Sequence, residues 1–206
     1  MGVDVSSPNC GAQIPASATF GIVGVTGGTD YSITNPCLAA QAAYFPKTLS
    51  LYANSGWNDH STKLDPSSPK ACAAGDADCL AYNYGYNAGL AAHDAATAAG
   101  VSSNVWWLDV ESDNSWNDDV IQNRNSLQGE HDALTARGAT IVGVYSTTSG
   151  WQTITGGWQN GWPNWIGADG AANAQGRQAC SGHQFNGGPT LVVQSDAHQI
   201  DRDIAC

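Results

Sequence analysis

Short apolar runs alternate with helical patterns along the chain up to residue 147, and this alternation limits the possible folds more than any other feature. Three helical patterns, at 36–45, 79–100 and 115–138, lie between five strand-like runs. A strand, a helix and a further strand in succession predict parallel strands joined by crossover helices. The five runs cover residues 2–6, 19–27, 48–55, 105–111 and 139–147.

Three more strand candidates follow, at 163–169, 182–187 and 190–196, and no segment after about residue 158 is long enough for a good helix. Eight candidate strands favour a closed barrel, and 206 residues lie near the lower size limit for a barrel of eight strand–helix units. We therefore predict an α/β fold, an irregular TIM-like barrel in which residues 1–206 form a single domain. The alternative is a doubly wound open sheet, which normally carries a Gly-rich phosphate loop after its first strand. The segment SSPNCG is not such a loop.

The composition excludes some partners. The formal net charge is −11, with only seven lysines and arginines, so the surface repels polyanions and nucleic acid is not an expected partner. No apolar stretch is long enough to span a bilayer. We expect a monomer that takes a neutral or cationic ligand.

Six cysteines are present, and none has the spacing of a zinc site. An even number without metal spacing favours three disulfides and a secreted protein. Of the fifteen possible pairings we predict Cys10–Cys37, Cys72–Cys79 and Cys180–Cys206; buried free thiols are the alternative. The start, MGVDVSSPNC, lacks the features of a signal peptide, so an exported protein would correspond here to a mature form with an added Met.

The segment NVWWLDVES, residues 104–112, ends a strand-like run with two carboxylates, Asp109 and Glu111. Residues i and i+2 of a strand point to the same side, with Cα atoms roughly 6.5–7 Å apart. In parallel barrels the chemistry gathers at the carboxyl ends of the strands. We expect Asp4 of the first strand and Asp201, near Asp203 in the last, to converge on the same mouth.

Two neighbouring carboxyl groups in an apolar setting drive their pKa values apart, so that one holds a proton while the other stays ionised. Glycoside hydrolysis uses such a pair, with a protonated acid for the leaving oxygen and a second group for the positively charged transition state. We select Glu111 as the acid, since it is longer and nearer the mouth. Flat aromatic rings would bind sugars, and Trp57 and Trp116 lie in loop-like surroundings suited to this role.

Other readings of the acids remain open. The Asp109–Glu111 pair could cap backbone groups or bind an arginine, and the four acids together could hold Ca²⁺ or Mg²⁺ through oxygen ligands. No regularly spaced calcium loop, HExxH zinc motif or GxSxG nucleophile motif occurs. We expect no metal and no cofactor.

With these residues in hand, the chain resembles the lysozymes of glycoside hydrolase family 25 and a divergent, secreted branch of family-25-like proteins found in actinobacteria. The resemblance spans essentially the whole chain. Its motifs are GVDVS at 2–6, WWLDVES at 106–112, GVYST at 143–147, WPNWIGA at 162–168 and QIDRD at 199–203.

The resemblance implies a (β/α)₅(β)₃ barrel that cleaves β-1,4 bonds of peptidoglycan. It implies that Glu111 is the general acid and that Asp109 assists the acetamido group or stabilises the intermediate. The sequence departs from the family pattern at SPNCG, residues 7–11, and at GVTGGTD, residues 24–30. By the same resemblance and by their places at strand ends, the remaining site candidates are the floor acids Asp4 and Asp201 and the substrate-binding residues Tyr52, Asn54, Tyr145 and Trp165.

Two functions from different classes follow. The first is a secreted glycoside hydrolase, a muramidase acting on peptidoglycan or an enzyme acting on another envelope or extracellular polysaccharide. The second is a catalytically silent barrel that binds glycans through its aromatic residues. Only the first requires Glu111 to keep a titratable acid.

Overall fold

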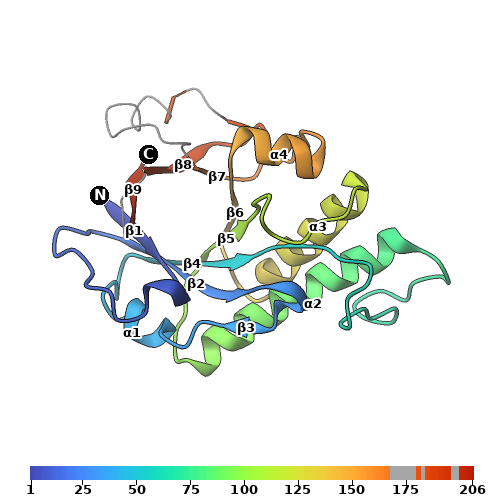
Figure 1. The fold of residues 1–206 in the computed structure, drawn as a ribbon, viewed down its shortest axis with the longest axis horizontal. Helices are drawn as coiled ribbons and strands as arrows, with labels where there is room; N and C mark the ends of the chain where they lie inside the picture. Colours follow the sequence, from blue (N-terminus) through green and yellow to red (C-terminus); the bar gives the residue numbers. More distant parts are fainter. Residues whose placement is uncertain (168–179, 182–183, 196–199) are drawn as a thin grey trace.

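Eight strands close a barrel in the computed structural model, which describes residues 1–167, 180–181, 184–195 and 200–206 (Figure 1). Each strand pairs with the next in the order given, and the last pairs with the first. The strands are β1 (Gly2–Val5), β2 (Gly21–Gly27), β4 (Leu49–Asn54), β5 (Val105–Asp109), β6 (Ile141–Ser146), β7 (Asn164–Gly167), β8 (Thr190–Ser195) and β9 (Asp201–Ala205). The predicted α/β barrel is therefore confirmed.

Neighbouring strands from β1 through β8 run parallel, whereas β9 runs antiparallel to both β8 and β1. Because β9 is reversed, its first residue, Asp201, lies at the end of the barrel where the parallel strands finish. A two-residue strand, β3 (Ile33–Thr34), pairs with the end of β2 outside the closed ring.

The prediction of a strand at 182–187 is wrong for residues 184–187, which form bends, and residues 182–183 lie outside the described part. The Asn186 side chain accepts a hydrogen bond from Asn164 Nδ2 at 2.8 Å, so this segment is held by side-chain amides instead of a strand ladder. The eighth barrel strand is β9, which the sequence patterns did not separate from β8. The predicted ends at 168–169 and at 196 also lie outside the described residues.

Helices cover the outside of the barrel: α1 (Leu38–Ala42), α2 (Ala77–Ala98), α3 (Val120–Ala136) and α4 (Thr148–Thr155), with short 3₁₀ turns η1 (Ser7–Asn9) and η2 (Thr29–Tyr31). Asp119 caps α3, where its side chain accepts a hydrogen bond from Ile121 N at 2.8 Å. Helix α4 was not predicted. Its N-cap is Thr147, whose hydroxyl accepts a hydrogen bond from Gly150 N at 3.0 Å. The helix ends at Gly156, which has a left-handed backbone conformation.

Helices α2 and α3 lie side by side along one flank of the barrel (Figure 1). Glycines allow this close approach. A Cβ atom on Gly85 would lie 1.8 Å from the backbone oxygen of Ser126, and one on Gly129 would lie 2.1 Å from that of Tyr82. These helices follow β4 and β5, so their packing fixes the two strand ends on which the acids stand.

The alternation of side chains along the strands divides the core into two parts. Residues facing outward from the strands pack against the helices, with Trp106, Leu108 and Val144 among them. The interior of the barrel holds a smaller cluster of Ile22, Trp107, Tyr145, Trp165 and Val192. Since Trp107 faces inward, Asp109 two residues later faces inward as well.

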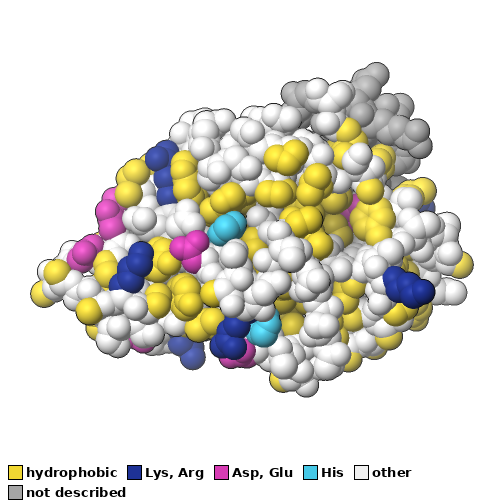
Figure 2. Space-filling view, turned by 180° about the vertical axis from the view of Figure 1, so that it is seen from behind, with side chains coloured by type: hydrophobic (Ala, Val, Ile, Leu, Met, Phe, Trp, Pro, Cys, Tyr) yellow, Lys and Arg dark blue, Asp and Glu magenta, His cyan; other side chains and the backbone are white. Residues whose placement is uncertain are grey.

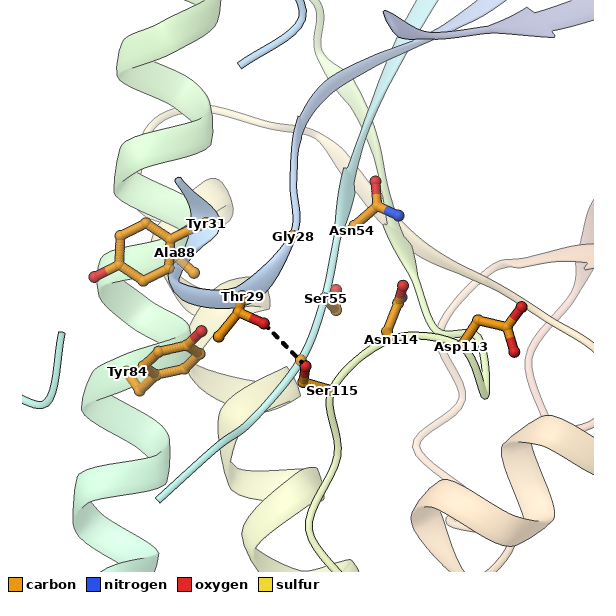
Figure 3. Close-up of a pocket in the computed structure, with 11 residues that line it drawn as sticks. Gly28, Thr29, Tyr31, Asn54, Ser55, Tyr84, Ala88, Asp113, Asn114 and Ser115 are labelled. Carbon is orange, nitrogen blue, oxygen red and sulfur yellow. Dashed lines mark hydrogen bonds between the residues drawn. The ribbon is translucent and has the colours of Figure 1, made fainter. Parts of the chain in front are cut away.

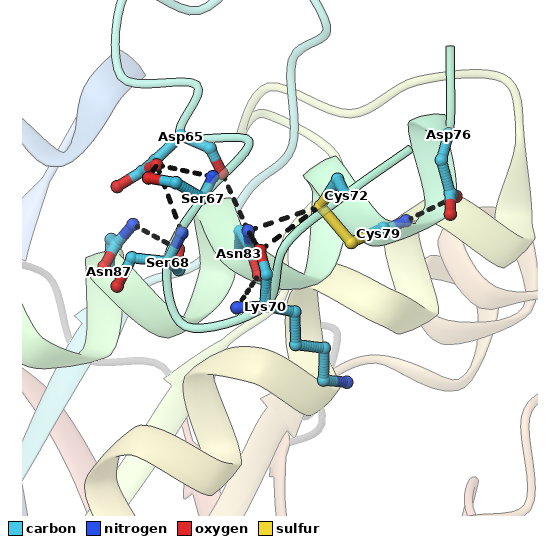
Figure 4. The surroundings of a disulfide bond; sticks show 9 residues. All are labelled: Asp65, Ser67, Ser68, Lys70, Cys72, Asp76, Cys79, Asn83 and Asn87. Carbon is cyan, nitrogen blue, oxygen red and sulfur yellow. Dashed lines mark hydrogen bonds between the residues drawn. A yellow bond between two sulfur atoms is a disulfide. The ribbon is translucent and has the colours of Figure 1, made fainter. Parts of the chain in front are cut away.

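The loop between β4 and α2 is pinned to the protein by the buried Asn83 of α2 (Figure 4). Its Nδ2 donates to the backbone oxygens of Asp65 and Lys70, both at 2.7 Å, and its Oδ1 accepts from Lys70 N at 3.1 Å. The Cys72–Cys79 disulfide closes the same loop onto the start of α2. This loop also supports the turn after β2, because Ser61 and Thr62 donate hydrogen bonds to the Asp30 carboxylate.

The three disulfides are Cys10–Cys37, Cys72–Cys79 and Cys180–Cys206, so the predicted pairing is confirmed. Within the described residues, no helix has the length and apolar character needed to cross a membrane. On the face seen in Figure 2, lysine and arginine side chains are scattered and form no continuous basic patch.

Candidate active site

The four predicted acids converge at the end of the barrel where the parallel strands finish. Asp4 lies in β1 opposite Asp201 of β9 in the strand register. The charges of Asp201 and Glu111 both act on Asp4, and those of Glu111 and Asp4 act on Asp109. These mutual effects show that residues distant in the sequence form one acidic cluster.

Asp109 is the buried member of the central pair, with only 4 % of its surface exposed. It is the last residue of β5, and Asn114 Nδ2 donates a hydrogen bond to its backbone oxygen at 2.9 Å. Its Oδ1 atom has no hydrogen-bond partner among the described residues. Burial raises the pKa of the Asp109 carboxyl group well above its ordinary value, and the nearby charges of Glu111 and Asp4 raise it further.

Glu111 lies two residues beyond β5, so the prediction that the strand extends to residue 111 is wrong. A turn begins here, where Asn114 N and Trp116 Nε1 donate to the Glu111 backbone oxygen at 3.1 and 2.8 Å. This turn places Glu111 at the rim as an exposed residue whose carboxyl group is partly buried.

Partial burial raises the pKa of Glu111, and the charges of Asp113 and Asp201 add to this effect. The carboxyl groups of Glu111 and Asp109 lie within hydrogen-bond reach of each other. That contact raises the pKa of Asp109 and lowers the pKa of Glu111. The pair therefore retains a proton at a pH where an isolated carboxyl group would have lost it.

The floor of the cluster contains two residues that the sequence analysis did not select, Asp203 and Gln194. Gln194 Nε2 donates to Asp4 Oδ2 at 3.0 Å, and Trp165 Nε1 donates to Asp203 Oδ1 at 2.9 Å. Burial raises the pKa of Asp4 to about 7, an effect that the Gln194 hydrogen bond opposes. Asp203 could have been found from its i+2 spacing to Asp201, whereas nothing in the sequence singles out Gln194.

Tyr52 and Tyr145 both lie beside the acids, as expected. The Tyr145 hydroxyl donates to Gln194 Oε1 at 2.6 Å, which links the tyrosine to Asp4 through one amide. Burial, followed by the surrounding carboxyl charges, raises the pKa of each tyrosine, so both stay neutral hydrogen-bond donors. The ring centroid of Trp165 lies 6.0 Å from that of Tyr52 and 4.4 Å from that of Tyr145.

A cleft of about 440 Å³ opens beside the central pair. Asp109, Glu111, Tyr52 and Asn54 line it together with the residues that follow β1 and the end of β2, whereas Asp4 and Asp201 do not belong to its lining. Gly24 of β2 keeps the cleft open because a Cβ atom there would lie 2.7 Å from the Tyr52 ring. We refer to this space as the catalytic cleft.

The three tryptophans that were predicted to bind the substrate lie in different environments. Trp165 is 2 % exposed and lies in the barrel interior, where it positions Asp203 and presents no free face to a ligand. Trp57 is 1 % exposed and packs under α2 and α3, with its Nε1 donating to Gln122 Oε1 at 2.9 Å. Trp57 therefore has no exposed face for a sugar, contrary to the prediction, and the sequence could not show that two helices cover its loop. Trp116 is half-buried beside Glu111.

None of the ion pairs between described residues involves Asp4, Asp109 or Glu111. The same part of the chain contains no group of three or more His, Cys, Asp or Glu side chains arranged to hold a metal ion. Carboxyl groups with raised pKa values beside a cleft are typical of sites that transfer protons.

The barrel fold is shared with lysozymes and glycoside hydrolases of known structure. A family model described as Lysozyme-like protein 1 matches residues 79–177, which include β5 with Asp109 and the turn with Glu111. A search of curated protein sequences found no match.

Solved structures with the same fold include a bacterial lysozyme from Streptomyces coelicolor, 18 % identical with a TM-score of 0.61, over 99 % of this chain and 90 % of that one. A muramidase from Trichobolus zukalii is 14 % identical with a TM-score of 0.63, over 100 % and 92 % of the two chains. A family 25 glycosyl hydrolase from Bacillus anthracis is 12 % identical with a TM-score of 0.57, over 99 % and 87 %. The resemblance to family 25 is thus confirmed for the fold.

Proposed function

We propose that this protein is a secreted glycoside hydrolase that cleaves β-1,4 bonds of peptidoglycan. The observation that carries the proposal is the proton-sharing pair Asp109–Glu111 at the end of β5, which lines a cleft and is affected by the charges of Asp4 and Asp201. Glycoside hydrolysis requires a carboxylic acid that is still protonated near neutral pH together with a second carboxyl group close by.

Glu111 serves as the general acid because its carboxyl group is at the rim, where a glycosidic oxygen can reach it. It donates its proton to the leaving oxygen as the bond to the sugar carbon breaks. Asp109, deeper in the floor, orients the acetamido group of the substrate or stabilises the positively charged intermediate. The ionised Glu111 then takes a proton from the water that completes hydrolysis, which restores the acid.

Several findings support peptidoglycan as the substrate class. The proteins with this fold include lysozymes and muramidases, and one is a pneumococcal autolysin solved with a synthetic peptidoglycan ligand. The three disulfides fit an oxidising compartment outside the cell. We propose that the protein acts there as a monomer on a polysaccharide.

The test is the release of reducing ends from purified peptidoglycan. Replacing Glu111 with Gln keeps the shape of the side chain but removes its proton, so we expect the rate to fall about 10²–10⁴-fold. The control is Asp118→Asn, which neutralises an exposed acid in the same loop and should leave the rate unchanged. Equal activity of the wild type and the Glu111→Gln variant would refute the assignment.

The two alternative functions are separated by the same assay on a wider panel. An enzyme for another envelope or extracellular polysaccharide would be inert on peptidoglycan but would release reducing ends from a different glycan, again dependent on Glu111. A glycan-binding barrel without catalysis would bind sugars and release no reducing ends from any of them. The raised pKa of Glu111 favours an enzyme over a binding protein.

A further inference from the structure

A second pocket, of about 140 Å³, opens beside the catalytic cleft (Figure 3). It lies between the turn after β2, the end of β4, helix α2 and the loop after β5. Gly28 and Asn54 line both spaces, so the pocket adjoins the cleft directly. A cavity of about 150 Å³ is known to hold a benzene molecule, so this pocket has room for the ring of one sugar unit but not for all of its substituents. We call it the side pocket.

The walls of the side pocket are held in place before any ligand arrives. Thr29 Oγ1 and Ser115 Oγ lie 3.2 Å apart in a hydrogen bond that joins the turn after β2 to the loop after β5 (Figure 3). Asp30 and Tyr31 both have left-handed backbone angles, with φ of 61° and 44°. The Asp30 carboxylate accepts hydrogen bonds from Ser61 Oγ and from Thr62 Oγ1, which fix this turn to the long β4–α2 loop.

Ser55 is a buried residue of the lining, 3 % exposed. Its hydroxyl interacts with the buried Glu130 carboxyl group and lowers the pKa of that group, against the larger effect of burial. This hydroxyl is therefore not available to a ligand, and the polar groups of the lining that remain accessible are those of Thr29, Asn114 and Ser115.

The chemistry of the lining selects a neutral, hydroxyl-bearing ring. Tyr31 and Tyr84 bring two aromatic rings, with centroids 5.4 Å apart, to one side of the pocket. Hydroxyl and amide groups of Thr29, Ser115 and Asn114 occupy the other side. Asp113 also belongs to the lining, whereas no Lys, Arg or His of the described residues does, and the chain has a net charge of −11, so a carboxylate would be repelled here.

We propose that the side pocket binds one neutral pyranose unit of the glycan, next to the units held in the catalytic cleft. The link to catalysis rests on the proposed function, whereas binding of the sugar does not. In this position the pocket discriminates against a sugar that bears a free carboxylate. Substrate choice would then depend on groups outside the acidic cluster.

The test uses calorimetric titration of a β-1,4-linked N-acetylglucosamine tetramer into the Glu111→Gln protein, which cannot degrade it. Ala88 of α2 lines the pocket, and Ala88→Leu in this background fills part of it. We expect at least tenfold weaker binding. The matched control is Ala98→Leu, an exposed position of the same helix, which should bind as the parent does. A tetramer oxidised to a carboxylate at C6 should bind more weakly than the neutral one.

A second variant covers the case in which Ala88→Leu does not fold. Tyr31→Ala removes one aromatic ring of the lining, and we expect severalfold weaker binding with an unchanged far-ultraviolet circular dichroism spectrum. Unaltered binding by a folded Ala88→Leu or by Tyr31→Ala would overturn the proposal, as would the absence of tetramer binding by the parent.

Failure of this proposal can be told apart from failure of the proposed function. If the wild type cleaves peptidoglycan but the pocket variants bind the tetramer normally, the pocket proposal fails and the enzyme stands. If the wild type releases no reducing ends while the pocket variants lose tetramer binding, the enzyme proposal fails and the pocket stands.

Discussion

Glu111 and Asp109 are only two positions apart in the sequence, yet their side chains lie in different environments. Asp109 is fixed inside the barrel by the strand, whereas the turn after β5 carries Glu111 to the rim. The pKa of Glu111 is raised first by partial burial and then by the charge of Asp113. Asp113 thus acts on the proposed acid from outside the barrel, through its charge.

Asp113→Asn should lower the pKa of Glu111, because it removes a nearby negative charge that disfavours ionisation. Activity is lost as the pH rises through the pKa of the acid, so the alkaline limb of the rate profile should move to lower pH. Rates of reducing-end release across the pH range measure this shift. Asp118→Asn lies in the same loop and is not among the charges that raise the pKa of Glu111, so it should leave the limb in place. An unmoved limb in Asp113→Asn would contradict the electrostatic role.

Among the elements, the pair α2–α3 matters most for the site because it supports the ends of β4 and β5. Glycine at positions 85 and 129 permits the contact. In an isolated helix, Gly85→Ala would stabilise by about 0.5–1 kcal/mol, since alanine loses less conformational entropy than glycine. Here the added methyl group would collide with the Ser126 backbone oxygen, so the substitution should lower the stability of the protein instead of raising it.

We expect Gly85→Ala to destabilise the protein by about 1–3 kcal/mol through overpacking. Thermal unfolding followed by circular dichroism measures the change, and Thr97→Ala, an exposed position on the same helix, is the control and should shift the midpoint little. A higher midpoint for Gly85→Ala would show that the helices are not in tight contact.

Which elements the sequence predicts depends on how locally they are determined. The runs that became β2, β5 and β6 are apolar on both faces, so their burial is evident from the sequence. Helix α4 has only eight residues and β9 follows β8 closely, so neither gives a clear period. The convergence of Asp4, Asp109 and Asp201 follows from barrel topology, but the burial of Trp57 and the bridging role of Gln194 depend on tertiary contacts.

At the scale of the whole molecule, buried carboxyl groups dominate the expected response to pH. The pKa values of Asp4, Asp109, Asp203 and Glu130 are all raised, mainly by burial. A raised native-state pKa contributes stability that is complete below the unfolded-state value and is lost as the pH rises through the native value. By contrast, hydrogen bonds lower the pKa of Asp30, so protonation costs stability at low pH. The protein should be most stable in mild acid.

Glu130 offers the clearest test of this pH response. Burial raises its pKa from an ordinary 4.5 to about 8, so its ionisation should cost up to roughly 5 kcal/mol of unfolding free energy between these values. Glu130→Gln should therefore flatten the fall in midpoint of urea unfolding from pH 5 to pH 8. Asp118→Asn should retain the steep fall. An equally steep fall in Glu130→Gln would contradict the assignment.

The central claim is that Glu111 holds its proton at a higher pH than a free glutamate. The chain contains only two glutamates, Glu111 and Glu130, so protein labelled with ¹³C at the glutamate carboxyl carbons should give two carboxyl resonances. The Glu111→Gln variant identifies the Glu111 resonance by its loss. We predict that this resonance titrates above the ordinary value of 4.5 and at the same pH as the alkaline limb of the rate profile. A midpoint at or below that ordinary value would contradict the account.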